Sequence, residues 1–371
     1  MTRVLIVTND FPPRPGGIQS FVHGLASRTP EVLVYAPQWP GCAAFDRLQP
    51  YPVVRHPSSL MLPTPAVARR AARLVAEHGA DTVVFGAAAP LGLLAPRLRA
   101  AGARRVVMLT HGHEASWAGA PGFRSVLRRI GEHADVVTYL GGYTRDRLAS
   151  VIPPGKLVRL APGVDPARFH PGVDGGVVRR ALDLGERPVV VCVSRLVPRK
   201  GQDQLVRAWP RVLRAVPEAV LMIVGGGPDA RRLARLVRAA GVAASVRFTG
   251  EVPSGSLPLY YAAGDVFAMP CRTRLGGVDV EGLGIVFLEA SATGLPVVAG
   301  ASGGAPDAVR QGETGFVVDG RSVGEVADTL ADLLGDRERA RKMGRTGREW
   351  VLSDWSWDQI GDRFRAILLD G

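Results

Sequence analysis

Short apolar runs rich in β-branched residues recur along the chain and alternate with segments of helical periodicity. In the first part of the chain the runs are Val4–Val7, Val32–Ala36, Thr82–Phe85, Val106–Leu109 and Val136–Tyr139. In the second part they are Val189–Val193, Val220–Val224, Val246–Phe248, Val266–Met269 and Pro296–Ala299. Segments with the apolar spacing of helices, such as Val67–Glu77, separate them. This alternation predicts parallel sheets that are covered by helices on both faces.

The two sets of runs are separated by a stretch rich in proline and glycine, residues 161–172. Because this composition interrupts regular elements and is typical of linkers, we place a domain boundary there. A chain of 371 residues is also long for one domain, and each half is long enough to bury its own core. We therefore predict two α/β domains, with residues 1–165 and 166–354 as their main bodies.

Two carboxylates with seven residues between them, Glu281 and Glu289, flank the start of an apolar segment in the second domain. The residues that lead from Glu281 into this segment are Gly282, Leu283 and Gly284. A helix that begins at Ile285 would present unpaired backbone N–H groups and the positive end of its dipole to an anion. The pattern indicates a phosphate site, with the two carboxylates reaching different parts of one extended ligand.

Two further stretches have the composition of anion sites at strand ends. Arg195 and Lys200 follow the run that ends at Val193, where fixed cations suit a diphosphate. Gly16 and Gly17 follow the first run and open a predicted helix, which lets a phosphate approach the backbone. Each motif alone also fits a solvated helix face or an ordinary turn. Their occurrence together and in this order is what makes the pattern informative.

Together these motifs resemble the retaining glycosyltransferases of the GT-B fold, family four. That family has Glu-x7-Glu in its C-terminal domain, an Arg and a Lys five residues apart after that domain's first strand, and a Gly-Gly loop near the N-terminus. Residues 195–203 and 271–290 are most similar to the actinobacterial phosphatidylinositol monomannoside mannosyltransferases. The resemblance covers nearly the whole chain. It implies two Rossmann-like domains whose parallel sheets face each other across a cleft, with the last helix, about residues 355–371, crossing back to the N-terminal domain.

For the C-terminal domain the resemblance implies a donor site. Arg195 and Lys200 are expected to contact the donor diphosphate. Because negative charge grows there as the glycosidic bond breaks, both are expected to be catalytic as well. Glu281, also expected to be catalytic, would orient the sugar, and Glu289 would hold the ribose. The backbone groups expected to assist at the phosphate are those of Gly282, Leu283, Gly284 and Ile285.

For the N-terminal domain the resemblance implies a second donor loop and an acceptor site. Gly16 and Gly17 are expected to contact the diphosphate, and His111 to bear on the transferred sugar as a fourth catalytic residue. Gln19 and Asp10 are assigned to the acceptor. A zinc site at the His111 loop is not expected, because its two histidines are only two residues apart and have one nearby glutamate.

The implied reaction moves mannose from GDP-mannose to a phosphatidylinositol mannoside, forms an α-1,6 linkage and retains the anomeric configuration. In the favoured front-face route the leaving phosphate takes the acceptor's proton. No cofactor and no metal are expected, because Arg195 and Lys200 already supply the positive charge. Two alternatives stay open within the family: another nucleotide sugar, such as UDP-glucose or UDP-GlcNAc, and a soluble inositol phosphate or sugar acceptor.

Basic residues are concentrated in the first half of a chain whose formal charge is +12. Residues 1–165 contain 19 Arg and Lys against 10 Asp and Glu, whereas the remainder contains 27 against 24. This excess suits an anionic membrane, a phosphorylated substrate or nucleic acid. Nucleic acid ranks last because aromatic residues are few and no nucleic-acid-binding motif is present.

We expect a cytoplasmic protein that binds peripherally to the inner face of the plasma membrane. No apolar stretch is long enough to span a bilayer, and the first residues are not typical of a signal peptide. A candidate membrane contact is the segment Leu60–Leu62, which is followed on one predicted helix by Arg69, Arg70 and Arg73. An ordinary packed loop beside a solvated helix is an equal alternative.

Two other classes of function compete with the glycosyltransferase reading. A Rossmann-type oxidoreductase requires G-x-G-x-x-G after the first strand and an acidic residue about 20 positions later, which residues 15–20 do not supply. A non-catalytic nucleotide-, carbohydrate- or lipid-binding module is disfavoured by the intact set of Arg195, Lys200, Glu281 and Glu289. Binding of a nucleoside diphosphate without sugar turnover would favour the binding module.

Overall fold

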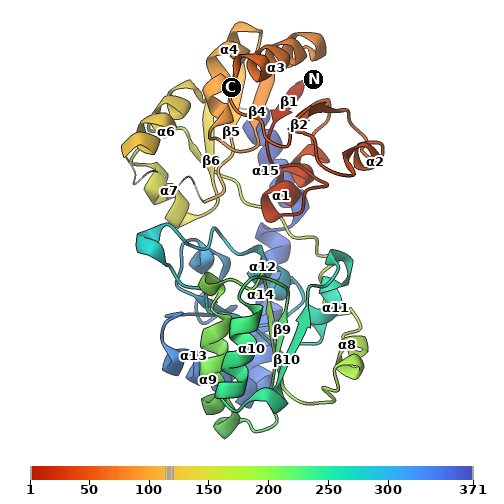
Figure 1. The fold of residues 1–371 in the computed structure, drawn as a ribbon, viewed down its shortest axis with the longest axis vertical. Helices are drawn as coiled ribbons and strands as arrows, with labels where there is room; N and C mark the ends of the chain where they lie inside the picture. The colour runs from red at the N-terminus through yellow and green to blue at the C-terminus, as the bar shows by residue number, and fades with distance from the viewer. Residues whose placement is uncertain (1, 113, 115–117, 119–120, 370–371) are drawn as a thin grey trace. The chain divides into compact units, whose positions relative to one another are not determined.

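The structure is a computed structural model that describes residues 2–112, 114, 118 and 121–369. The chain forms two compact units. Unit 1 consists of Met1–Gly163 and Trp357–Gly371, and unit 2 of Val164–Ser356. Figure 1 shows the helix that ends the chain, at the blue end of the colour scale, beside the red and orange elements that begin it. The first boundary between the two units, after Gly163, falls inside the stretch rich in proline and glycine.

Unit 1 is built on a seven-stranded parallel sheet with the order β3-β2-β1-β4-β5-β6-β7. Its strands are β1 Val4–Val7, β2 Val32–Pro37, β3 Val53–His56, β4 Thr82–Phe85, β5 Arg105–Met108, β6 Val136–Tyr139 and β7 Leu157–Arg159. Its described helices are α1 Gly17–Ala26, α2 Cys42–Asp46, α3 Pro65–His78, η1 Leu91–Leu94, α4 Ala95–Ala100, α6 Pro121–His133, α7 Gly142–Leu148 and α15 Trp357–Leu369.

Unit 2 is built on a six-stranded parallel sheet with the order β10-β9-β8-β11-β12-β13. Its strands are β8 Val189–Val193, β9 Val220–Val224, β10 Val246–Gly250, β11 Val266–Met269, β12 Val297–Gly300 and β13 Gly315–Val318. Its α-helices are α8 Gly176–Ala181, α9 Gln202–Ala215, α10 Ala230–Ala239, α11 Leu257–Ala262, α12 Ile285–Ala292, α13 Val323–Gly335 and α14 Arg337–Asp354. Its 3₁₀ turns are η2 Pro198–Lys200, η3 Ala243–Ser245, η4 Ser254–Ser256, η5 Leu275–Gly277 and η6 Ala305–Ala308.

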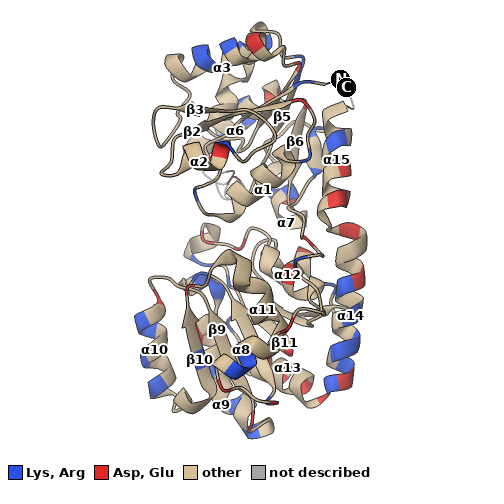
Figure 2. Cartoon of the chain, turned by 90° about the vertical axis from the view of Figure 1, so that its right-hand side faces the viewer, with Lys and Arg blue, Asp and Glu red and all other residues tan. Residues whose placement is uncertain are grey.

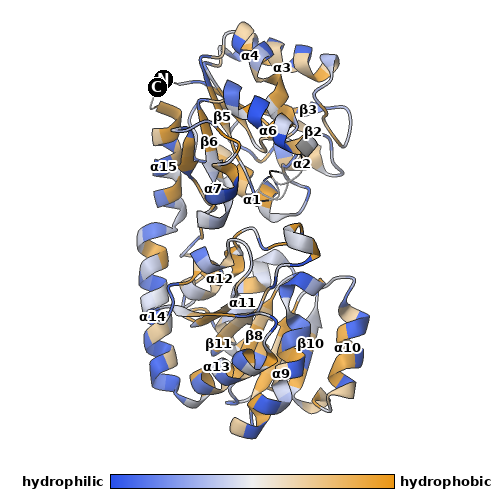
Figure 3. Ribbon diagram, turned by 90° about the vertical axis from the view of Figure 1, so that its left-hand side faces the viewer, coloured by the Kyte–Doolittle hydropathy of each residue, from blue (hydrophilic) through white to orange (hydrophobic). Residues whose placement is uncertain are grey.

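Burial on both faces explains why the central strands are continuous apolar runs. Every residue of β1, β8, β9 and β11 is buried, as a parallel sheet between two helical layers requires. Figure 2 shows the Lys, Arg, Asp and Glu residues mainly on helices and loops, and Figure 3 shows the strands as the most hydrophobic elements. The prediction of two α/β domains with parallel sheets is confirmed.

The last helix, α15, packs within unit 1, as expected. A Cβ added to Gly24 of α1 would lie 2.3 Å from Trp357, so only glycine lets the two helices approach this closely. The Arg28 guanidinium lies 4.8 Å from the Trp357 ring centroid, and Arg105 Nε donates to the Ile367 carbonyl over 2.8 Å. These contacts join the end of the chain to the first sheet. No described helix is long and apolar enough to cross a membrane.

Candidate functional site

In unit 2 the predicted donor residues lie beyond the carboxyl ends of the strands, where ligands of parallel sheets bind. Arg195 and Lys200 follow β8, and Glu281 lies between β11 and α12. Lys200 ends the 3₁₀ turn η2, and Gly201 then takes φ +79°, a conformation that favours glycine. This turn directs the Lys200 amine toward Glu281.

Lys200 and Glu281 form an ion pair that is largely shielded from solvent. Lys200 Nζ lies 2.7 Å from Glu281 Oε2, and the two side chains are 12% and 8% exposed. Arg199 Nε lies 4.0 Å from the same oxygen, and Arg199 Nη1 lies 3.4 Å from Asp279 Oδ1. The structure therefore brings together the cation and the carboxylate that the sequence assigned to the diphosphate and the sugar, and adds Arg199 beside them.

The main chain at Glu281 is held by two glycines that follow β12. Gly304 N–H donates to the Glu281 carbonyl over 3.0 Å, and Glu281 N–H donates to Ser302 Oγ over 3.3 Å. A Cβ at Gly303 would lie 2.0 Å from the Glu281 carbonyl oxygen, and one at Gly304 would lie 2.2 Å from that of Gly282. Since no side chain fits in either space, the two glycines allow the backbone contact that positions Glu281.

The segment before α12 has the geometry of an anion site. Gly284 has φ +79° and precedes the first helical residue, Ile285, as the sequence predicts. Within the described part of the chain, the backbone N–H groups of residues 282–285 have no protein acceptor. Unpaired amides at a helix N-terminus suit a phosphate.

Glu289 lies on α12 and is partly buried. Tyr261 Oη donates to Glu289 Oε2 over 2.7 Å, and Tyr261 itself is fully buried. Burial raises the pKa of the Glu289 carboxyl, and the Tyr261 hydroxyl and Arg168 oppose this rise. Tyr261 thus orients the carboxylate assigned to the ribose, a contact that sequence patterns did not indicate.

Arg195 differs from its predicted partners because its side chain is exposed. Among the described residues its guanidinium has no hydrogen-bond or ion-pair partner. An unengaged guanidinium beyond β8 is available to an anionic ligand and is not needed to hold the fold.

In unit 1 the predicted acceptor residues are joined by a hydrogen bond. Gln19 Nε2 donates to Asp10 Oδ1 over 2.7 Å, and Gln19 is only 6% exposed although it lies on helix α1. A Cβ at Gly16 would lie 2.1 Å from Gln19 Oε1, whereas one at Gly17 would meet nothing within 4 Å. Gly16 therefore makes room for Gln19, in addition to any approach to a phosphate.

His111 lies close to this group, beyond the end of β5. Its Nε2 is 2.5 Å from the Gly86 carbonyl, and its ring packs edge-on against Phe21 of α1 with 5.8 Å between centroids. Gly86 in turn packs against Thr8, whose hydroxyl accepts from the Asp10 N–H over 2.9 Å. His111 is thus linked to Asp10 through Gly86 and Thr8. The second histidine of the loop, His113, lies outside the described residues.

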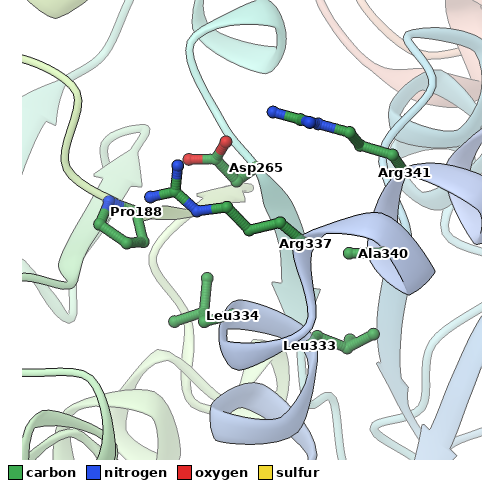
Figure 4. A pocket seen from close by; sticks show the side chains of 7 residues that line it. All are labelled: Pro188, Asp265, Leu333, Leu334, Arg337, Ala340 and Arg341. Atoms are coloured by element: carbon green, nitrogen blue, oxygen red, sulfur yellow. The ribbon is translucent and has the colours of Figure 1, made fainter.

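Two hollows of the molecule lie near the amino ends of the strands, on the side of each sheet opposite the predicted site. A cavity of about 30 Å³ in unit 2 lies beside Pro188 and Asp265, which precede β8 and β11 (Figure 4). A groove of about 480 Å³ in unit 1 is lined by Arg105 and Asp135, at the start of β5 and just before β6. Because ligands of parallel sheets bind at the carboxyl ends, neither hollow is the candidate site.

Sequence reasoning assigned no role to a buried ion pair beside Lys200. Arg272 donates from both terminal nitrogens to the two carboxylate oxygens of Asp203, each over 2.9 Å. Both residues lie in the quoted motifs, but no local spacing reveals a pair 69 residues apart. Among the described residues, no group of three or more His, Cys, Asp or Glu side chains is arranged to hold a metal.

Comparison with known proteins places this chain in a family. Residues 178–350 match the family described as glycosyl transferases group 1, and residues 17–168 match glycosyltransferase family 4. The chain is 57% identical over 378 residues to a Mycobacterium tuberculosis protein named GDP-mannose-dependent alpha-(1-6)-phosphatidylinositol monomannoside mannosyltransferase, covering 99% of this chain and 98% of that protein. The chain belongs to glycosyltransferase family four. The resemblance found in the motifs is thereby confirmed.

One further relative agrees with this assignment, and one solved structure shares the fold. A Corynebacterium glutamicum protein named GDP-mannose-dependent monoacylated alpha-(1-6)-phosphatidylinositol monomannoside mannosyltransferase is 46% identical to this glycosyltransferase over 374 residues, covering 99% and 97% of the two chains. Among solved structures, Anabaena HepE in complex with UDP superposes with a TM-score of 0.84 at 19% identity over 100% of both chains. This last likeness shows that the glycosyltransferase shares the fold.

Proposed function

We propose that this glycosyltransferase moves mannose from GDP-mannose to a phosphatidylinositol monomannoside through an α-1,6 linkage. Two relatives with this named activity match nearly the whole chain, at 57% and 46% identity. The observation that carries the proposal is that Lys200 and Glu281 are paired over 2.7 Å at the strand ends of unit 2, with Arg195 exposed nearby in the chain. A cation for the leaving diphosphate and a carboxylate for the sugar are thus held together.

The donor is assigned to unit 2. Lys200 and Arg195 stabilise the diphosphate as the bond from C1 to the phosphate oxygen breaks, because these cations are worth most where charge develops. Glu281 orients the sugar hydroxyls, Glu289 binds the ribose, and the amides before α12 assist at the phosphate. The bond from C1 to the acceptor oxygen forms on the same face, and the acceptor's proton passes to the leaving phosphate.

The acceptor is assigned to unit 1. Asp10 and Gln19 are joined over 2.7 Å and offer a carboxylate and an amide to the hydroxyl groups of an inositol. His111, fixed by the Gly86 carbonyl, contacts the transferred sugar. The reaction is proposed to need no metal, since the acidic residues near Glu281 are matched by cations: Asp279 lies 3.4 Å from Arg199 and 3.5 Å from Arg274.

The proposal is tested by following radiolabelled sugar from GDP-mannose or UDP-glucose into purified phosphatidylinositol monomannoside or soluble inositol 1-phosphate. We expect label in the lipid from GDP-mannose only. Arg195→Gln is expected to reduce this transfer about a hundredfold, because one cation at the developing charge is lost. Its folding is expected to be unchanged, since the Arg195 side chain is exposed.

Other outcomes separate the alternatives. Transfer from UDP-glucose, or to the soluble acceptor alone, would overturn the proposed substrates while keeping the family. Binding of GDP, seen by calorimetry, without transfer from either donor to either acceptor would instead favour a binding protein. Label in the lipid that is the same for Arg195→Gln and the unmodified chain would remove Arg195 from the site.

We also propose that unit 1 touches an anionic membrane through its segment at residues 60–62. Asn9 holds this segment with two hydrogen bonds to the Met61 main chain, of 2.8 and 2.7 Å. The Met61 side chain is buried, while Leu60 and Leu62 on either side are 53% and 50% exposed. Helix α3 follows with the arginines visible in Figure 2. Apolar tips beside basic residues favour anionic bilayers.

Binding to sedimenting vesicles of phosphatidylglycerol and phosphatidylcholine tests this contact. The double variant Leu60→Ser/Leu62→Ser is expected to bind about tenfold more weakly to the anionic vesicles, since two side chains no longer enter the interface. Leu352→Ser, which removes a leucine that is 42% exposed in unit 2, serves as the matched control. Equal binding of the double variant and the control would contradict the contact.

A further inference from the structure

Four charged side chains form a network beyond the ends of β8, β9 and β11. At its centre Asp203 of α9 receives the two bonds from Arg272, and these side chains are only 7% and 14% exposed. Arg232 of α10 lies 3.5 Å from Asp203 and makes two bonds of 2.6 Å to Asp229. The network therefore ties together the loops that follow three neighbouring strands of the sheet.

The segment that contains Lys200 is bound to the end of β11 at three points. Arg272 N–H donates to the Arg199 carbonyl over 2.8 Å. A Cβ at Gly201 would lie 2.0 Å from the Pro270 carbonyl oxygen, so the two main chains are in direct contact there. The Arg272–Asp203 ion pair is the third contact. Lys200 lies between the first and the last of these contacts.

The geometry of the Arg272–Asp203 ion pair is better suited to positioning two segments of the chain than to stabilising the fold. A buried ion pair contributes little net stability, because removing both charges from water costs about as much as their attraction returns. Two parallel bonds from a planar guanidinium, in contrast, fix the distance and the angle between two segments. Burial alone would raise the pKa of Asp203, but Arg272 and Arg232 outweigh this and lower it. The carboxylate is thus held in its charged form.

We propose that the Arg272–Asp203 pair is a positioning device that holds the Lys200 amine against Glu281. Arg272 acts through Lys200 and does not itself touch the substrate. The inference rests on the proposed function for its meaning in catalysis, since Lys200 is there the cation on the donor diphosphate. The placement of Lys200 itself is independent of which sugar is transferred.

The first measurement is the reactivity of Lys200 toward an N-hydroxysuccinimide ester, read by peptide mass spectrometry. The chain has three lysines, so Lys156 and Lys342 serve as internal references. In Arg272→Gln we expect Lys200 to be acylated at least fivefold faster relative to Lys342, because its amine is no longer held against Glu281. Arg272→Lys, which retains a charge, is expected to fall between Arg272→Gln and the unmodified chain.

Arg179→Gln is the matched control. Arg179 pairs with Asp265 over 2.8 Å in the same unit but at the amino ends of the strands, and its side chain is 20% exposed. It also donates to the carbonyls of Gly185 and Arg187. Its loss should lower the melting temperature at least as much as Arg272→Gln does, while the reactivity of Lys200 stays the same. Equal Lys200 reactivity in Arg272→Gln and Arg179→Gln would overturn the inference.

A second measurement compares GDP binding by calorimetry in a double-mutant cycle. Arg272→Gln is expected to weaken GDP binding about tenfold in the unmodified chain and less than twofold in a Lys200→Ala background, because Arg272 acts through Lys200. If Arg272→Gln weakened GDP binding by the same factor in both backgrounds, Arg272 would act by a route that does not involve Lys200. If the unmodified chain bound no GDP, the proposed donor would be wrong, whereas the lysine reactivities would still decide the positioning role.

Discussion

Lys200→Ala is expected to lower kcat/KM for mannose transfer by about 10³-fold, the scale of removing one preorganised charge from a developing anion. The reason is local, because the Lys200 amine lies 2.7 Å from Glu281 in a site where both side chains are nearly buried. Most of the loss should appear in kcat and the rest in KM, since the charge on the leaving diphosphate is greater in the transition state than in the bound donor. Initial-rate kinetics with varied GDP-mannose measure both.

The same substitution leaves the negative charge of the Glu281 carboxylate with less positive charge nearby. Arg199 Nε, at 4.0 Å, is then its nearest described cation. Breaking a buried pair from one side typically costs about 3 kcal/mol of stability, so urea denaturation must accompany the kinetics. Lys342→Ala, at an exposed position of α14, is the control for loss of a lysine. An unchanged kcat/KM in well-folded Lys200→Ala would remove Lys200 from the chemistry.

Central strands could be predicted from the sequence because a strand that is buried on both faces consists of consecutive apolar residues. Val4–Val7, Val189–Val193 and Val220–Val224 were predicted with the bounds that the structure shows. The strands missing from the prediction are β3, β7 and β13, each at the edge of its sheet. In β3 all four residues are only partly buried, and in β7 no residue is fully buried. An edge strand is less covered by its neighbours, so these three lack the continuous apolar signal, whereas β10, also at an edge, was found from its short apolar run.

The candidate site was predictable to the extent that strand ends determine position. Lys200 and Glu281 follow strands that neighbour each other in the sheet, so topology alone brings them close. The side chains that hold them could not be predicted. Tyr261 reaches Glu289 from α11, and Arg272 reaches Asp203 across the end of the sheet. Such pairs depend on tertiary distances that neither periodicity nor spacing in the chain encodes.

Gly303→Ala is expected to damage the donor site severely although it adds only one methyl group. Gly303 has φ +53°, and its added Cβ would lie 2.0 Å from the Glu281 carbonyl oxygen, a backbone atom that cannot turn aside. Left-handed strain and overpacking together predict a loss of about 3 kcal/mol in the free energy of unfolding. The contact can be relieved only by moving Glu281. A displacement of about 1 Å at a catalytic group lowers kcat/KM about a hundredfold.

Gly312→Ala isolates the effect of the contact from that of the backbone conformation. Gly312 also has a positive φ, +77°, but its added Cβ would meet nothing within 4 Å. This variant should therefore lose only about 1 kcal/mol through strain and retain its activity. Urea denaturation and initial-rate kinetics on both variants separate the cost of the backbone conformation from the cost of the steric contact. If Gly303→Ala matched Gly312→Ala in activity, Glu281 would tolerate displacement and could not be the group that orients the sugar. A hundredfold difference between two glycines of similar φ would instead tie catalysis to the position of the Glu281 main chain.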